Sequence, residues 1–160
     1  MTLKAQQYAE AARHIHGLVA GETDLIAVMS TIACELHQRM DHFDWTGFYR
    51  VVSSRLLKVG PYQGGHGCLV IPFEKGVCGQ CARERKPQVV PDVRQLPHHI
   101  ACSTTTRSEI VVPIFDESGE LRAVLDVDSD SPDAFDHQDV IQLERICRWL
   151  TPLYQESVSP

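Results

Sequence analysis

The sequence lacks any long hydrophobic run. A membrane-spanning helix needs about 18 or more consecutive apolar residues, and no stretch of this chain approaches that length. The first residues, Met1 to Gln7, contain neither an apolar segment nor the small-residue cleavage site that marks a secretion leader. We therefore expect a water-soluble protein without a membrane partner, located in the cytoplasm.

An excess of positive charge is also absent. The chain carries 15 Lys and Arg against 21 Asp and Glu, which gives a net charge of −6 at pH 7 with histidine neutral. Its basic residues are dispersed along the chain, whereas binding to a phosphate backbone needs a concentrated surface of Lys and Arg. We expect no nucleic-acid partner.

A complete set of zinc ligands is missing as well. The C-G-Q-C run from Cys78 to Cys81 has the spacing of half a zinc site or of a thioredoxin-like redox pair, but there is no second CxxC. His66, His98 and His99 are irregularly spaced, and the segment after Cys81 is too short and charged for the long helix of a thioredoxin motif. We expect neither a metal nor a cofactor.

The chain does contain a clear pattern of helices and strands. Apolar residues recur at three- and four-residue steps over residues 2–20 and 22–40, which predicts two helices. Alternation predicts a strand over 43–51, and further strands are expected at 56–62, 68–73, 88–92, 109–115 and 121–129. A short helix at 77–85 and a closing amphipathic helix that begins at Asp136 complete the pattern. This order predicts an α+β fold, with an antiparallel or mixed sheet flanked by helices.

Three acidic residues are predicted to meet on this sheet. Glu109 begins one strand of a hairpin, while Asp126 and Asp128 lie two residues apart on the other strand and so share a face. Such a group is consistent with a solvated sheet edge. However, the two aspartates interrupt an apolar run that starts at Ala123, where an unpaired carboxylate costs desolvation free energy. The residues alone leave both interpretations open, a solvated edge or a functional acid cluster.

Cys102 has the surroundings of a reactive thiol. It follows the loop-like stretch from Pro97 to Ala101 and precedes the hydroxyl run from Ser103 to Thr106. Backbone donors and neighbouring hydroxyls stabilise a thiolate, and cysteines are seldom structural bridges in a reducing cytoplasm. We therefore interpret Cys102 as a candidate nucleophile.

Seven segments, in order, resemble the free methionine-(R)-sulfoxide reductases, a family built on the GAF domain. They are D-W-T-G-F-Y at 44–49, G-P-Y-Q-G at 60–64, I-P-F-E-K-G-V-C-G at 71–79, V-V-P-D-V at 89–93, H-I-A-C at 99–102, S-E-I-V-V-P at 108–113 and L-D-V-D-S at 125–129. The resemblance implies a single GAF domain over residues 1–160, with one central antiparallel sheet flanked by helices. It also implies thiol-dependent reduction of free L-methionine-(R)-S-oxide.

The resemblance assigns roles to individual cysteines. It makes Cys102, in H-I-A-C, the thiol that attacks the sulfoxide sulfur. It makes Cys68 the principal resolving cysteine and Cys78 a further cysteine that joins disulfide exchange. Cys81 stands where small residues are more usual, which leaves open which disulfides are populated.

The resemblance also implies a binding pocket. Glu109, Asp126 and Asp128 would hold the sulfoxide and ammonium groups, and Trp45 would form an aromatic wall for the S-methyl group. A carboxyl that burial and acidic neighbours keep neutral can protonate the sulfoxide oxygen, and Glu109 is our candidate for this acid.

Two expectations about partners complete the sequence-based picture. Thioredoxin is the expected reductant, and GAF relatives often form homodimers.

The alternative to an enzyme is a non-catalytic GAF sensor that binds a small molecule in the same pocket and uses its cysteines as a redox switch. No output domain or long coiled-coil helix is recognisable in the sequence, which favours the enzyme.

Overall fold

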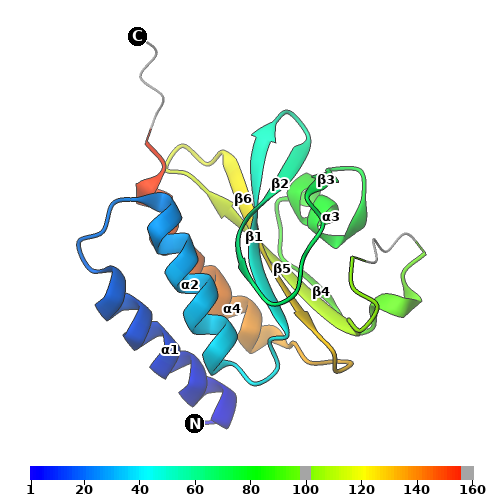
Figure 1. Cartoon of the computed structure of the whole chain (residues 1–160), viewed down its shortest axis with the longest axis horizontal. Coiled ribbons are helices and arrows are strands. Elements are labelled where there is room, and N and C mark those ends of the chain that lie inside the picture. The colour runs from blue at the N-terminus through cyan, green and yellow to red at the C-terminus, as the bar shows by residue number, and fades with distance from the viewer. Residues whose placement is uncertain (98–101, 156–160) are drawn as a thin grey trace.

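Six strands form one antiparallel sheet at the centre of the molecule (Figure 1). The computed structural model describes residues 1–97 and 102–155. The strand order is β3-β2-β1-β6-β5-β4, and each neighbouring pair is antiparallel. The strands are β1 (Trp45–Ser53), β2 (Leu56–Gln63), β3 (Val70–Pro72), β4 (Gln88–Val90), β5 (Ser108–Phe115) and β6 (Leu121–Ser129). The predicted α+β fold with a central antiparallel sheet is confirmed.

Helices accompany the sheet where the periodicity predicts them. The α-helices are α1 (Leu3–Val19), α2 (Leu25–Arg39), α3 (Gly76–Glu84) and α4 (His137–Cys147), and 3-10 helices cover η1 (Val93–Gln95) and η2 (Arg148–Leu153). The closing helix is shorter than its apolar pattern indicates, because the chain continues after Cys147 as the 3-10 helix that contains Pro152. In the described residues, no helix is both long enough and apolar enough to cross a membrane.

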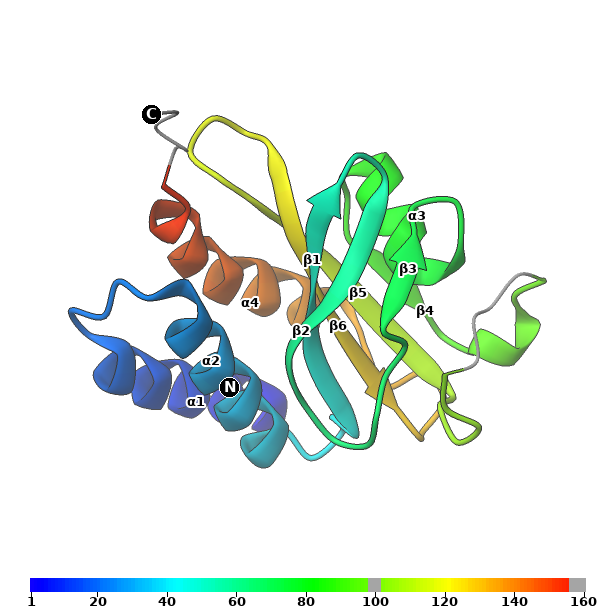
Figure 2. The ribbon, with the colours of Figure 1, turned by 45° about the horizontal axis from the view of Figure 1, so that its top comes forward.

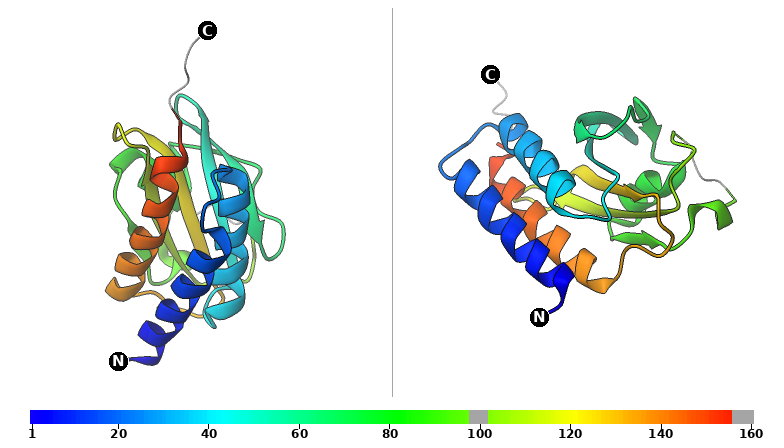
Figure 3. Two further views of the ribbon diagram at one scale, coloured as in Figure 1. Left: turned by 90° about the vertical axis from the view of Figure 1, so that its left-hand side faces the viewer. Right: turned by 60° about the horizontal axis from the view of Figure 1, so that its bottom comes forward.

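The two faces of the sheet have different surroundings. Helices α1, α2 and α4 cover one face, and α3 lies on the other (Figure 2, Figure 3). Alternate residues of β5 and β6 point to the three-helix side and form the larger apolar core with it: Ile110, Val112, Ile114, Ala123, Leu125 and Val127. Their neighbours Val111 and Val124 pack instead in a smaller cluster on the α3 side. The residues in step with these two neighbours, Glu109, Asp126 and Asp128, therefore face α3.

Helix α4 begins at the predicted residue, and its first turn is fixed by a buried carboxylate. Asp136 is the N-cap, and its backbone N–H donates to Asp139 Oδ2 over 2.8 Å in a capping box. Asp139 is fully buried. It also accepts hydrogen bonds from the Tyr8 hydroxyl (2.7 Å), Lys4 Nζ (2.7 Å) and His42 Nε2 (2.9 Å). One carboxylate thus joins the starts of α1 and α4 to the loop before β1.

This network makes a stability prediction at Asp139. Burial alone would raise the pKa of this carboxyl, but the bonds from His42, Lys4 and Tyr8 outweigh burial and hold the pKa well below its usual value of 3.8. We expect Asp139→Asn to lower the free energy of unfolding by about 2 to 4 kcal/mol at neutral pH, because Lys4 loses its buried anionic partner. Urea unfolding at pH 7 measures this loss.

The sign of the pH dependence provides a second check. Because folding lowers the pKa of Asp139, the stabilisation is present above pH 3.8 and is lost as the pH falls through the folded pKa. The difference in the free energy of unfolding between the wild type and Asp139→Asn should therefore become smaller in acid. Asp133, an exposed aspartate, supplies the control Asp133→Asn. Equal losses for the two variants would contradict the role of Asp139.

Candidate active site

Three carboxyl groups lie together on the α3 side of the sheet. Glu109 on β5 is the direct cross-strand partner of Asp128 on β6, and Asp126 lies two residues away on the same face of β6. Glu109 is 6% exposed and Asp126 5% exposed, and Asp128 is half-buried. Both strands lie inside the sheet, not at its edge. The three acids therefore lie together inside the sheet, with Glu109 and Asp126 buried and Asp128 half-buried.

Burial raises the pKa of all three carboxyl groups, and the charges of acidic neighbours raise those of Glu109 and Asp128 further. For Glu109, desolvation is the largest cause of the raised pKa, followed by the charges of Asp126 and Asp128. Desolvation and then the charge of Asp126 likewise raise the pKa of Asp128. Burial raises the pKa of Asp126 to about 6, although hydrogen bonds with Glu109 and Cys78 oppose this rise. The cluster therefore retains protons near neutral pH and can donate one.

Cys78 lies on α3 directly beside these acids. Its sulfur and one carboxyl oxygen each of Glu109 and Asp126 all lie within 4.8 Å of one another. Desolvation, and then the charges of Asp126 and Glu109, raise the pKa of the Cys78 thiol well above its usual value. The thiol is therefore neutral. Gly79 allows α3 to pack closely on the turn that precedes it, because a Cβ there would lie 2.5 Å from the carbonyl oxygen of Phe73.

The CxxC does not supply two ligands to one metal site in the described residues. Cys81 is fully buried in the apolar cluster on the α3 side, while the group with ligand-like spacing joins Cys78 to Glu109 and Asp126. All three members of that group have raised pKa values, whereas a metal needs deprotonated ligands. The histidines at 98 and 99 lie outside the described residues.

Trp45 forms one wall of the site and is fixed on several sides. Its ring stacks on Tyr49 and Tyr62, with centroids 5.8 Å and 5.3 Å away. Its Nε1 donates a 2.7 Å hydrogen bond to the carbonyl oxygen of Gly65. Gly67 lies so close that a Cβ there would be 2.8 Å from the Trp45 ring. The loop between β2 and β3 therefore packs against the indole, and this loop carries Cys68.

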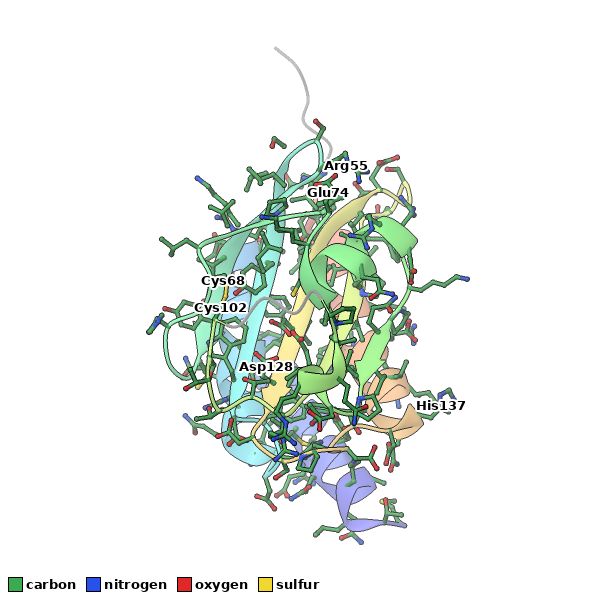
Figure 4. The ribbon with its side chains drawn as sticks, turned by 90° about the vertical axis from the view of Figure 1, so that its right-hand side faces the viewer. Arg55, Cys68, Glu74, Cys102, Asp128 and His137 are labelled. Atoms are coloured by element: carbon green, nitrogen blue, oxygen red, sulfur yellow. A yellow bond between two sulfur atoms is a disulfide. The ribbon has the colours of Figure 1, made fainter. Side chains whose placement is uncertain are left out.

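Cys68 and Cys102 form a disulfide at the rim of the site (Figure 4). Their Cα atoms are 5.6 Å apart, and 34 residues separate them in the sequence. Cys68 lies in the loop before β3, since the strand expected from residue 68 begins only at Val70. Cys78 and Cys81 are free. The pairing is compatible with the attacking and principal resolving thiols that the resemblance implies.

One cavity of about 490 Å³ unites these groups. All seven residues named from the sequence line it: Trp45, Cys68, Cys78, Cys102, Glu109, Asp126 and Asp128. The cavity has an acidic floor, an aromatic wall and a sulfur rim, so it suits a small polar molecule that receives a proton and reacts with a thiol.

Among the lining residues that sequence reasoning did not assign to the site are Tyr49 and Asp130. Tyr49 is buried, and desolvation followed by the charge of Asp126 raises its pKa, so its hydroxyl is neutral. The signal was present in part, because Trp45 and Tyr49 lie four residues apart on one strand and therefore share a face. Asp130 follows the end of β6, where strand alternation no longer predicts direction.

Known proteins are similar to this chain in sequence and architecture. A family model described as a GAF domain matches residues 22–149. GAF domain-containing protein A of Dictyostelium discoideum is 39% identical over 92% of this chain and 92% of its own. The free methionine-R-sulfoxide reductase of Escherichia coli is 34% identical over 89% of this chain and 90% of its own.

A solved structure extends the likeness to three dimensions. The free methionine-R-sulfoxide reductase of Neisseria meningitidis, in complex with its substrate, superposes with a TM-score of 0.89 at 40% identity. The match covers 96% of this chain and 91% of that one. The chain belongs to the GAF-domain family of free methionine-(R)-sulfoxide reductases.

Proposed function

We propose that this protein reduces free L-methionine-(R)-S-oxide to L-methionine with Cys102 as the attacking thiol. The observation that carries the proposal is the single cavity in which the Cys68–Cys102 pair and three proton-holding carboxyl groups meet. Reduction of a sulfoxide by a thiol needs both a nucleophilic sulfur and an acid for the departing oxygen. Family membership supports this reaction over other thiol chemistry.

The cavity offers separate places for the parts of the substrate. Asp126 Oδ1 is buried and has no hydrogen-bond partner among the described residues, so a free α-ammonium group would satisfy it. Trp45 and Tyr49 present an apolar wall to the S-methyl group. Glu109, with its raised pKa, is the proposed acid for the sulfoxide oxygen. A peptide-bound sulfoxide has no α-ammonium group and would leave the Asp126 oxygen unpaired.

The proposed reaction has three steps: formation of a sulfenic acid, formation of a disulfide and reduction of that disulfide. The Cys102 thiol releases its proton to solvent, and the thiolate attacks the sulfoxide sulfur while Glu109 protonates the sulfoxide oxygen. The oxygen passes to the Cys102 sulfur as a sulfenic acid, the substrate leaves as methionine, and the Glu109 carboxylate takes a proton back from solvent. The Cys68 thiol then condenses with the sulfenic acid, forms the disulfide and releases the oxygen as water. A dithiol finally reduces the disulfide by exchange and is itself oxidised to a disulfide. We propose thioredoxin as this dithiol and the cytoplasm as the compartment.

The role of Cys78 in recycling stays a prediction. Its raised pKa lowers the thiolate fraction that exchange requires, which makes Cys78 a poor resolving thiol in this environment. A homodimer also remains an expectation from GAF relatives.

The proposed function makes a stereochemical prediction. In an assay coupled to thioredoxin, thioredoxin reductase and NADPH, methionine-(R)-sulfoxide should drive NADPH consumption and the S epimer should not. N-acetylmethionine-(R)-sulfoxide tests the ammonium contact, and we expect its kcat/KM to be at least about 10²-fold lower, since a buried charged partner is lost.

The comparisons in this assay separately test the reaction, the ammonium contact and the reductant. If neither thioredoxin nor dithiothreitol supports turnover of either epimer, the reductase proposal is wrong and a sensor is favoured. Comparable turnover of the N-acetylated sulfoxide would exclude Asp126 as an ammonium partner. Turnover with dithiothreitol alone would retain the reaction and reject thioredoxin.

A further inference from the structure

An exposed apolar surface adjoins the redox disulfide. Leu69 directly follows Cys68 and is 74% exposed, and the next residue, Val70, is 43% exposed. Cys68 and Cys102 are themselves only half-buried, and Figure 4 shows them next to each other. We call Leu69 and Val70 the Leu69 face. An exposed leucine is not unusual by itself, but this one adjoins a reactive group.

The segments that carry Cys68 and Cys102 contain no charged residue, although the exposed Lys58 on β2 lies directly opposite Val70. From Gly60 to Phe73, and again from Cys102 to Thr106, the sequence contains no Asp, Glu, Lys or Arg, although 22% of the chain is charged. Val70 begins β3, the outermost strand of the sheet, so no further strand of the described chain lies beyond it. The face is therefore apolar and accessible, with the single charge of Lys58 beside Val70.

We propose that the Leu69 face docks a protein dithiol of the thioredoxin class and guides its thiolate to Cys68 Sγ. The inference rests on the proposed function, which requires a reductant. The incoming thiolate forms an intermolecular disulfide with Cys68 and releases Cys102 as a thiolate. The second thiol of the partner then attacks that intermolecular disulfide, which frees Cys68 and leaves the partner oxidised. Attack at Cys68 restores the nucleophile Cys102 in the first exchange.

The size of the face favours a transient partner over a second copy of this chain. A stable interface buries about 800 Å² on each side, which two side chains do not approach, whereas weak redox encounters bury much less. Anything seated on Leu69 also borders Cys68, so a permanent occupant would obstruct the reductant. A protein that binds briefly and carries its own thiol satisfies both conditions.

The test compares a protein reductant with a small one. We expect Leu69→Asp to lower kcat/KM for thioredoxin by about tenfold or more, because it places a charge in the centre of an apolar contact. Turnover driven by dithiothreitol should stay within about twofold of the wild type, since a small reductant needs no docking surface. The fold should survive, because the bond that Leu69 makes to Val59 N–H uses its backbone oxygen. The matched control is Ile141→Asp, a 48% exposed residue on α4.

Every other pattern of results overturns the inference. Unchanged thioredoxin kinetics in Leu69→Asp, or an equal loss with both reductants, would exclude docking at this face. A wild-type dimer that Leu69→Asp dissociates in size-exclusion chromatography would make the face a dimer contact. A thioredoxin with only its attacking cysteine should be trapped on Cys68, and trapping on Cys102 would contradict the geometry. Failure of the wild type with dithiothreitol would instead reject the proposed function.

Discussion

Replacing Cys102 with serine is expected to reduce turnover of methionine-(R)-sulfoxide by at least about 10³-fold, to the level of the background reaction. A hydroxyl oxygen is a poor nucleophile at neutral pH. It also cannot take up the sulfoxide oxygen, as a thiol does when it becomes a sulfenic acid. The loss should be the same with thioredoxin and with dithiothreitol, because the first step is blocked. Coupled NADPH consumption and direct quantification of methionine both measure it.

The disulfide partner should behave differently from the attacking thiol. Cys68→Ser should release about one methionine per chain and then stop in the thioredoxin-coupled assay, since Cys102 remains as a sulfenic acid without its resolving thiol. A 1,3-dione trap followed by mass spectrometry should find that sulfenic acid on Cys102. Cys34→Ser, which changes a half-buried thiol on α2, is the matched control and should retain full turnover.

Cys78→Ser separates the two candidate resolving thiols. If Cys78→Ser stopped after one turnover while Cys68→Ser continued, the assignment of the resolving thiol would be reversed. Full thioredoxin-driven turnover by Cys102→Ser would refute the nucleophile itself.

Much of this site follows from short-range rules. Period-two alternation is enough to place Asp126 and Asp128 on one face and Glu109 opposite them, because β5 and β6 form a hairpin. The start of α4 is likewise predictable, since Asp136 is a good N-cap. The likeness to a known family supplied the roles of the cysteines, which no spacing in the chain determines.

The features that could not be predicted depend on contacts between distant segments. From the sequence, Asp139 is predicted only as a favourable negative charge in the first turn of α4. In the fold it also accepts a hydrogen bond from Tyr8, 131 positions away. The neutral state of Cys78 arises because α3 packs against the acid cluster, and the sequence around Cys78 does not show that packing. The contact of Trp45 with the loop before Cys68 similarly requires the folded β2–β3 connection.

Glu109→Gln is expected to lower kcat/KM for methionine-(R)-sulfoxide by about 10² to 10⁴-fold, the usual contribution of a general acid. Glutamine preserves the size of the side chain but has no dissociable proton to transfer. In the wild type, the acid works only while protonated, so activity should fall as the pH rises through the raised pKa of Glu109. This basic limb of the pH profile should be absent from the variant. The control is Glu117→Gln, at an exposed turn residue.

Stability measurements distinguish loss of the acid from collapse of the cavity. The folded pKa of Glu109 is raised above its ordinary value of 4.5, so its contribution to stability is fully present below 4.5 and is lost as the pH rises through the folded pKa. Near neutral pH the wild type therefore bears the cost of burying an acid that ionises when the chain unfolds. Glutamine is neutral in both states, so Glu109→Gln should melt at a higher temperature than the wild type at pH 7 to 8, and this advantage should shrink towards pH 4. An inactive variant that melted at a lower temperature would instead show that Glu109 supports the shape of the cavity, and its assignment as the proton donor would fail.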